Sequence, residues 1–211
     1  MLDVHAPHER MPGFKDFLLH LLTITIGLLI ALSLEGCVEW RHHRSLVREA
    51  EEGLRSEIDR NSQVVGALKR QIAEQQKQLN QDLDAVAQLK TDPGSHPQMS
   101  FGFGLQGFDE VSWKTAQSTG AIGYMPYADA RTYSDIYATQ DEVYKAERDV
   151  VEGVMRAASF PSTKGEDWKP TPVEMDELTD RIGMLRMRLS LLNSLVDALN
   201  SSYGKFKAEQ R

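Results

Sequence analysis

Hydrophobic residues follow two different patterns along this chain. Residues 17–34 read FLLHLLTITIGLLIALSL and contain no Lys, Arg, Asp or Glu. An uncharged apolar run of about 18 residues, rising about 1.5 Å per residue, is long enough to cross the hydrocarbon core of a bilayer as a helix. Beyond this run, apolar residues recur every three or four positions, which is typical of amphipathic helices. The sequence therefore predicts a transmembrane helix over 17–34, followed by a helical domain.

The first amphipathic stripe begins directly after the apolar run, with no helix-breaking residue between the two. We therefore expect one helix from about Gly13 to Lys90, whose apolar stripe is interrupted by Asn61 and Gln75 at stripe positions. The residues 92–97, DPGSHP, end this helix, and a glycine- and phenylalanine-rich loop follows. The apolar members of the stripe are Val47, Leu54, Ile58, Val65, Leu68, Ile72, Leu79, Leu83, Val86 and Leu89.

Three further helices are predicted from the rest of the chain. A short helix covers about 109–119 and is capped by Gly120, and a turn follows over 123–126. Apolar positions then describe a long helix that ends near Ser159 and a final helix that ends near Phe206. The long helix buries Tyr133, Ile136, Tyr137, Val143, Tyr144, Val150, Val151 and Val154, and the final helix, which Thr171 or Pro172 opens, buries Met175, Leu178, Ile182, Leu185, Leu189, Leu192, Leu195, Val196 and Leu199.

These elements predict an all-α fold. The transmembrane helix continues into a long amphipathic helix, which packs with two further long helices and one short helix as an antiparallel bundle. The expected organisation is an N-terminal tail over 1–16, the transmembrane helix over 17–34, a juxtamembrane stalk over 35–60 and a soluble bundle over 61–211. Residues 160–172 form a linker before the last helix.

Charge and cysteine content narrow the possible partners and the compartment. The formal net charge of -7 argues against a nucleic-acid partner, which would need clustered basic residues. Cys37 is the single cysteine, so the soluble part can form no internal disulfide, which is compatible with an oxidising compartment. Because Leu34 to Cys37 partly resembles a lipobox, a cleaved lipoprotein signal stays open as an alternative, although Glu35 fits that motif poorly.

Flanking charges give a weak prediction of orientation. Arg10 and Lys15 precede the apolar run, whereas Arg41, Arg44 and Arg48 follow it. Basic residues favour the cytoplasmic side, so the two flanks nearly balance. An uncleaved N-terminal anchor commonly inserts with its tail in the cytoplasm, and this together with a cysteine-free domain favours a short cytoplasmic tail and a periplasmic domain. A cytoplasmic domain remains the alternative.

The membrane segment and its flanks carry a family resemblance. Lys15-Asp16-Phe17, the run HLLTITIGLLIALSLEGCVEWRHHR, and then Glu49, Glu57 and Asn61 resemble a group of uncharacterised bacterial single-pass membrane-anchored proteins. These share an ITIGLLIAL-type helix, an EW.HHR juxtamembrane block and a later W..A...G helix, which here holds Trp113, Ala116 and Gly120. The resemblance implies a bacterial inner-membrane protein with a helical domain. It carries no functional residue over, because the group has no assigned activity.

Five small or polar residues share one stripe of the predicted transmembrane helix, which suggests an interface with another membrane helix. Gly27 and Ala31 have the small-xxx-small spacing that lets two helices approach closely. His20 is ionisable within the membrane segment, where such a group usually has a buried partner. Haem ligation by His20 would need a second ligand from another subunit, so a hydrogen bond is preferred. The stripe consists of His20, Thr23, Gly27, Ala31 and Glu35.

The residues after the apolar run suit the membrane interface. Tryptophan and basic side chains favour the headgroup region, so we interpret Trp40, Arg41, His42, His43 and Arg44 as an interfacial anchor. The same stretch holds a Glu-x-x-His unit that resembles those of di-metal bundles, but such sites need matching units from other helices. We therefore expect no metal and no cofactor.

Aromatic residues gather around the central loop and the short helix. They either line a ligand pocket or cap the bundle, and we expect Trp113 to be largely buried. The chain has no Walker loop, no nucleophile elbow, no His-Glu-x-x-His motif and no Rossmann fingerprint, so an enzyme is not expected. The sequence predicts instead a membrane-tethered interaction protein that self-associates or serves as an accessory subunit, and the alternative is a ligand-sensing module. The aromatic residues are Phe101, Phe103, Phe108, Trp113, Tyr124 and Tyr127.

Overall fold

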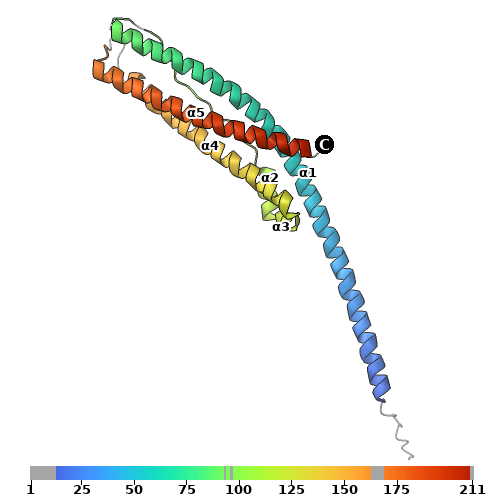
Figure 1. Ribbon diagram of the computed structural model, residues 1–211. Coiled ribbons are helices and arrows are strands. Elements are labelled where there is room, and N and C mark those ends of the chain that lie inside the picture. The colour runs from blue at the N-terminus through green and yellow to red at the C-terminus, as the bar shows by residue number, and fades with distance from the viewer. Residues whose placement is uncertain (1–12, 93, 96, 163–168, 210–211) are drawn as a thin grey trace, which may run out of the picture. The chain divides into compact units, whose positions relative to one another are not determined.

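A computed structural model describes residues 13–92, 94–95, 97–162 and 169–209 (Figure 1). Most of the predicted N-terminal tail and residues 163–168 of the predicted linker lie outside these residues. The described part is all-α, as predicted, and has no strand. Its helices are α1 (Phe14–Thr91), α2 (Val111–Ser118), α3 (Ala121–Tyr124), α4 (Tyr127–Ser162) and α5 (Pro172–Glu209). The chain divides into two compact units, Met1–Arg48 and Glu49–Arg211, and α1 contributes to both.

The long N-terminal helix has the bounds that the sequence predicts. At its start the Gly13 amide donates a hydrogen bond to Asp16, whose carboxylate also suits the positive end of the helix dipole. The helix ends just before Asp92, whose side chain accepts the amide of Gly94 in a turn. In the first unit, every described residue up to His42 is exposed. Residues 13–42 therefore have no core of their own.

The last helix begins where a capping box forms. The Thr171 hydroxyl accepts the Glu174 amide, and the Glu174 carboxylate accepts the Thr171 amide in return. Pro172 occupies the first helical position, where its missing N–H costs nothing. The prediction that Thr171 or Pro172 opens this helix is confirmed.

One local prediction was wrong between the short helix and the second long helix. The expected turn over 123–126 contains instead the end of α3 (Ala121–Tyr124), and α4 begins already at Tyr127. The first turn of α4 exposes its side chains and buries nothing before Tyr133, so apolar periodicity could not reveal it. Gly120, the predicted cap, has a left-handed φ of 77°, a conformation that glycine adopts without strain.

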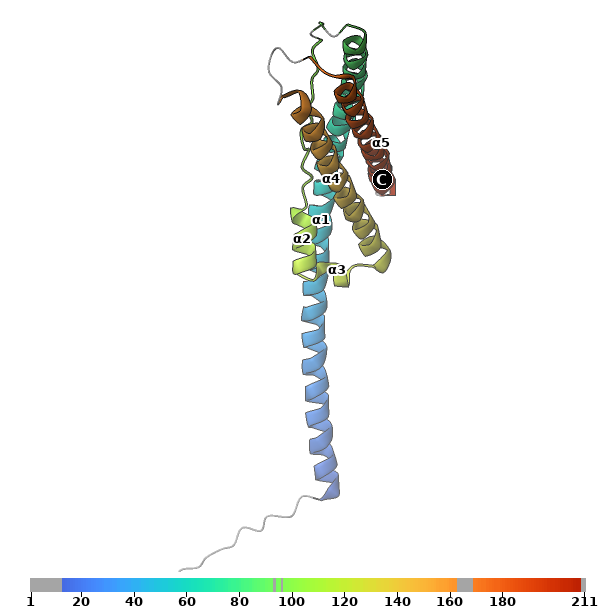
Figure 2. The same cartoon turned by 90° about the vertical axis from the view of Figure 1, so that its left-hand side faces the viewer.

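The direction of each helix in the second unit follows from its hydrogen bonds. Glu57 and Asn61 of α1 bind Tyr137 and Gln140 of α4 in the same order along both helices, so α1 and α4 run in the same direction. Three ion pairs connect α1 with α5 in reverse order, so these two helices are antiparallel (Figures 1 and 2). The pairs are Asp59–Lys207, Lys69–Asp197 and Lys90–Asp176.

An extended segment, residues 97–110, connects the end of α1 with the start of α2. Figure 2 shows it as it descends past α4. It binds α1 in reverse order: the Ser100 amide donates to Asp82, the Gly104 carbonyl accepts from Gln71, and Asp109 pairs with Asn61. The segment therefore fills the second place in an up-down-up-down arrangement. The segment lies there without being helical, and side chains of α1 form hydrogen bonds with its backbone amides and carbonyls at Ser100, Gly104 and Asp109.

The core agrees with most of the predicted stripes. Val47, Leu83, Val151 and Leu195 are only half-buried, and Tyr144 is exposed. Asn61 and Gln75 are buried, as their stripe positions predict. Leu54, Glu57 and Ile58 are fully buried, so the packed part of α1 begins before residue 61, where the sequence placed the end of the stalk. The sequence missed four further buried polar residues, Glu57, Asp82, Gln140 and Glu147.

Candidate functional site

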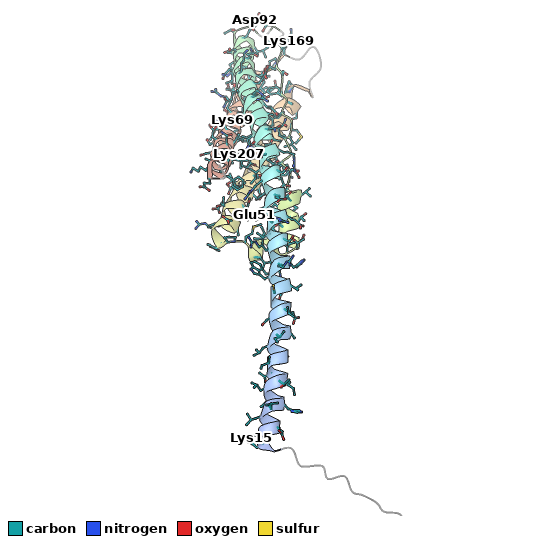
Figure 3. The ribbon with its side chains drawn as sticks, turned by 90° about the vertical axis from the view of Figure 1, so that its right-hand side faces the viewer. Lys15, Glu51, Lys69, Asp92, Lys169 and Lys207 are labelled. Atoms are coloured by element: carbon teal, nitrogen blue, oxygen red, sulfur yellow. The ribbon has the colours of Figure 1, made fainter. Side chains whose placement is uncertain are left out.

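The apolar part of α1 is uncovered in this chain. Large side chains such as Leu19 and Ile24 are 65% and 68% exposed, and the most apolar 18-residue window has a mean hydropathy of 2.4. Figure 3 shows side chains projecting from α1 along its length from Lys15 onward. By length and composition this helix could cross a membrane.

The hydroxyl groups within the apolar part form hydrogen bonds inside the helix. Thr23, Thr25 and Ser33 each donate to the backbone carbonyl four residues earlier, at 2.7 to 2.8 Å. Such bonds remove the cost of placing a hydroxyl in hydrocarbon. These three hydroxyl groups are therefore compatible with lipid.

The predicted transmembrane interface lies on the exposed surface of α1. His20, Thr23, Gly27, Ala31 and Glu35 are all exposed, and a methyl group added at Gly27 would meet no atom within 4 Å. At 100° per residue they occupy about a third of the helix circumference. The stripe thus offers a shallow surface with room for a second helix.

The predicted interfacial anchor shows contacts within α1. The Arg44 guanidinium lies 5.3 Å from the centre of the Trp40 ring, and His43 lies 4.0 Å from a Glu39 carboxylate oxygen. Arg41 and His42 are exposed. In the described parts of the chain, no group of three His, Cys, Asp or Glu side chains is arranged to hold a metal ion.

In the second unit, Glu57 forms the centre of a buried polar cluster. Its carboxylate accepts hydrogen bonds from the Tyr137 hydroxyl at 2.5 Å, the Ser112 amide at 2.6 Å and the Trp113 amide at 3.3 Å. Ser112 and Trp113 lie in the first turn of α2, whose N-cap residue Glu110 makes no side-chain cap. Glu57 therefore caps α2 from another helix, and its charge suits the positive end of the α2 dipole.

The phenol beside Glu57 is held in its neutral form. Burial raises the pKa of Tyr137, and the adjacent Glu57 carboxylate raises it further. The Tyr137 ring also stacks on the Trp113 indole, with centroids 4.8 Å apart and planes 5° apart. The buried phenol donates a hydrogen bond to a carboxylate that also accepts two backbone amides of α2. The cluster therefore holds the start of α2 against α1 and α4.

Asn61 fastens the end of the extended segment in the same way. Its amide group donates to the Asp109 carbonyl at 2.8 Å, while its oxygen accepts the Asp109 amide at 2.9 Å. The same Asn61 nitrogen is 3.3 Å from the Gln140 oxygen, which also accepts the Tyr203 hydroxyl. Side chains of α1, α4 and α5 are thereby linked by a series of hydrogen bonds that starts at the Asp109 backbone, just before α2.

An ion pair between Arg60 and Asp109 also holds the C-terminal end of the extended segment. Arg60 contacts the Asp109 carboxylate at 2.7 Å, and the Val111 amide donates to the same carboxylate at 3.2 Å. The Arg60 bond is the main reason why the pKa of Asp109 lies below its ordinary value. Both side chains are partly exposed, so the pair positions the backbone more than it stabilises the fold.

Two further buried acids bind the middle of the extended segment. Asp82 accepts the Ser100 amide at 3.0 Å, and Glu147 accepts the Gln106 amide at 2.9 Å. The second carboxylate oxygen of each has no hydrogen-bond partner. Burial accordingly raises the pKa of Asp82, and it raises that of Glu147 to about 7.

The six predicted aromatic residues do not form one pocket wall. A hollow of about 500 Å³ lies beside α2 and is lined by Gly107, Phe108, Asp109, Glu110, Val111, Lys114 and Tyr144. Phe108 is the single member of the six among these lining residues. Phe101, Phe103 and Trp113 are half-buried, so the expectation of a largely buried Trp113 holds only in part, and Tyr124 and Tyr127 are exposed.

Comparisons with known proteins were made for the whole chain. No protein family, curated protein or solved structure matches it. The assignment of a function therefore rests on the residues and their geometry.

The buried acids are the part of the site that sequence reasoning missed. Glu57, Asp82 and Glu147 occupy positions on the buried faces of α1 and α4, where a helical pattern alone assigns charged residues to the solvent side. A usable signal was present: each lies within three or four residues of buried apolar positions on both sides along its helix. The partners of these acids are backbone amides of residues 100–113, which no sequence pattern identifies.

Proposed function

We propose that this chain is a membrane-tethered helical interaction protein, whose transmembrane helix associates with another transmembrane helix. The partner is a second copy of the chain or a subunit of a larger membrane complex. The observation that carries the proposal is the stripe formed by His20, Thr23, Gly27, Ala31 and Glu35, on a helix whose residues from 13 to 42 are all exposed.

The physical argument has two steps. An exposed apolar surface along the whole of 17–34 would not stay in water, so it must be covered by lipid or by protein. Inside a bilayer, lipid covers leucine as well as protein does, and helices associate through close packing and hydrogen bonds. Small residues at Gly27 and Ala31, with His20 nearby, supply both.

The buried clusters of the second unit support a structural role for the soluble domain. Glu57, Asp82 and Glu147 each bind backbone amides of the same chain, and none of the three lines the hollow beside α2. Carboxylates that are occupied in this way hold the segment 97–110 and α2 in place. We therefore propose no catalytic role for them, and the ligand-sensing alternative stays a prediction.

The proposed location is a bacterial inner membrane, with the soluble domain in the periplasm. Support comes from the resemblance of the membrane segment to bacterial anchored proteins and from the absence of cysteine after Cys37. The flanking charges nearly balance, so the orientation needs the direct test described at the end of the Discussion.

The stripe is tested by the double substitution Gly27→Leu with Ala31→Leu. Both changes raise apolarity and so preserve insertion, but they block close approach of a second helix. We expect at least a fivefold loss in co-purification of two differently tagged copies, which corresponds to about 1 kcal/mol. Where the partner is another subunit, crosslinking in native membranes shows the same loss.

The matched control is Thr25→Leu with Ser33→Leu, which raises apolarity equally on other sides of the helix. This variant should associate like the wild type. Unchanged assembly of the Gly27/Ala31 variant, or an equal loss in both variants, would show that the stripe is not an interface.

A further inference from the structure

We propose that Arg41, Arg44 and Arg48 form a docking face for the headgroups of anionic phospholipids, at the point where α1 leaves the bilayer. We call these three residues the arginine face. The proposal deepens the membrane anchoring proposed above and rests on it. It adds a lipid class as a specific ligand.

Before residue 49, the charges around this part of α1 are sorted by side. At 100° per residue, the three arginines lie within about 60° of one another, and Glu35 and Glu39 lie on the opposite side, about 170° away. Glu39 is directed to His43, at 4.0 Å. Beyond Arg48, Glu51 and Glu52 lie on the same side as the arginines, and Glu51 pairs with Arg55. Arg41 and Arg44 have no acid three or four residues away along the helix, so these two positive charges are left for an external anion.

The side chains suit phosphate groups at the depth of the headgroups. A guanidinium binds phosphate with two parallel hydrogen bonds, which an ammonium group does not match. The Arg44 guanidinium lies over the Trp40 ring at 5.3 Å, and tryptophan favours the membrane interface. Trp40 therefore fixes both the depth and the direction of the nearest arginine.

The arginine face leaves the proposed helix interface open. Its centre lies about 90° around the helix from the centre of the stripe formed by His20 to Glu35. One α1 helix can therefore contact a partner helix and anionic lipids at the same time. At the other end of the apolar run, Lys15 is followed directly by Asp16, so the described residues there carry no net charge. The preference for anionic lipid should accordingly concern one leaflet.

The test uses the full chain, purified in mild detergent and offered equal amounts of phosphatidylglycerol and phosphatidylcholine, with bound lipids counted by native mass spectrometry. The test variant is Arg41→Gln, Arg44→Gln, Arg48→Gln. The control variant is Lys77→Gln, Arg148→Gln, Arg186→Gln, which removes the same charge from exposed positions of the second unit. Each arginine near an anionic surface contributes about a fivefold preference, so the wild type and the control should retain phosphatidylglycerol at least fivefold over phosphatidylcholine.

We expect the test variant to bind both lipids about equally and still to co-purify with a second tagged copy. A variant that keeps the phosphatidylglycerol preference, or a control that loses it to the same extent, overturns the arginine face but leaves the membrane anchor intact. Release of phosphatidylglycerol by inorganic phosphate alone would show a free-phosphate site and would also overturn the proposal. A wild-type chain that binds neither lipid contradicts the anchoring itself.

Discussion

Glu57→Ala is expected to cost the second unit about 3–5 kcal/mol of its free energy of unfolding. The substitution removes the carboxylate that accepts the Tyr137 hydroxyl and two amides of α2. All three donors would stay near the core without a partner, and each unsatisfied donor costs about 1–3 kcal/mol. The loss should appear as a lower midpoint in urea unfolding of the full chain in mild detergent, followed by circular dichroism.

Two companion variants separate the cluster from general damage to α1. Glu52→Ala removes an exposed acid from the same helix and should change the free energy of unfolding by no more than about 0.5 kcal/mol. Tyr137→Phe removes one of the three donors together with its own hydrogen bond, so it should cost about 1–2 kcal/mol. A Glu57→Ala variant that loses less than about 1 kcal/mol would mean that the carboxylate does not clamp α2.

The second large effect concerns pH. Burial raises the pKa of Glu147 to about 7 in the folded chain, whereas in the unfolded chain the group has its ordinary value of 4.5. Between these two values the folded state holds a proton that the unfolded state has lost, so stability falls as pH rises through this window. The wild type should therefore lose about 1–3 kcal/mol between pH 5 and pH 8.

Glu147→Gln should remove most of this pH dependence. The glutamine oxygen can still accept the Gln106 amide, and no charge is then buried at alkaline pH. The variant should be more stable than the wild type at pH 8 and close to it at pH 5, as measured by urea unfolding at four pH values. Glu142→Gln, an exposed neighbour on α4, serves as the control and should keep the wild-type slope. Parallel slopes for wild type and Glu147→Gln would contradict this account.

The shifted pKa values of Asp82 and Asp109 do not cancel the effect in that window. The pKa of Asp82 is raised by burial too, so its contribution has the same sign. The pKa of Asp109 is lowered by Arg60, and its contribution is lost only as pH falls below the ordinary value of 3.8. The comparison of Glu147→Gln with Glu142→Gln therefore isolates a single buried acid.

The helices were predictable because their stripes are long and regular. The start of α5 followed from Thr171 and Pro172, and the end of α1 from the turn at Asp92. The early start of α4 was not predictable, since its first turn buries no side chain. The periodicity of apolar residues predicts which side chains are buried, but it does not show which part of the chain packs against them.

The extended segment shows the same limit. Residues 97–110 read as a loop, and nothing in their composition indicates that they take the place of a bundle helix. Their position depends on Asp82, Asn61 and Glu147, which lie far away in sequence and bind backbone groups. Backbone groups carry no sequence signature, so these contacts required the structure. The aromatic residues between Phe101 and Tyr127 show the opposite. These six residues are close in sequence, yet they do not line one hollow together.

Membrane anchoring is tested most directly by protease treatment of spheroplasts, followed by alkaline carbonate extraction and detection of an N-terminal tag. The account predicts a short tagged fragment, cut after Arg44, that stays in the carbonate-washed membrane while the helical domain is lost. An intact tagged chain in the membrane would place the domain in the cytoplasm and correct the orientation. A tagged chain or fragment in the carbonate supernatant would show that residues 17–34 do not span the bilayer, which contradicts the central claim.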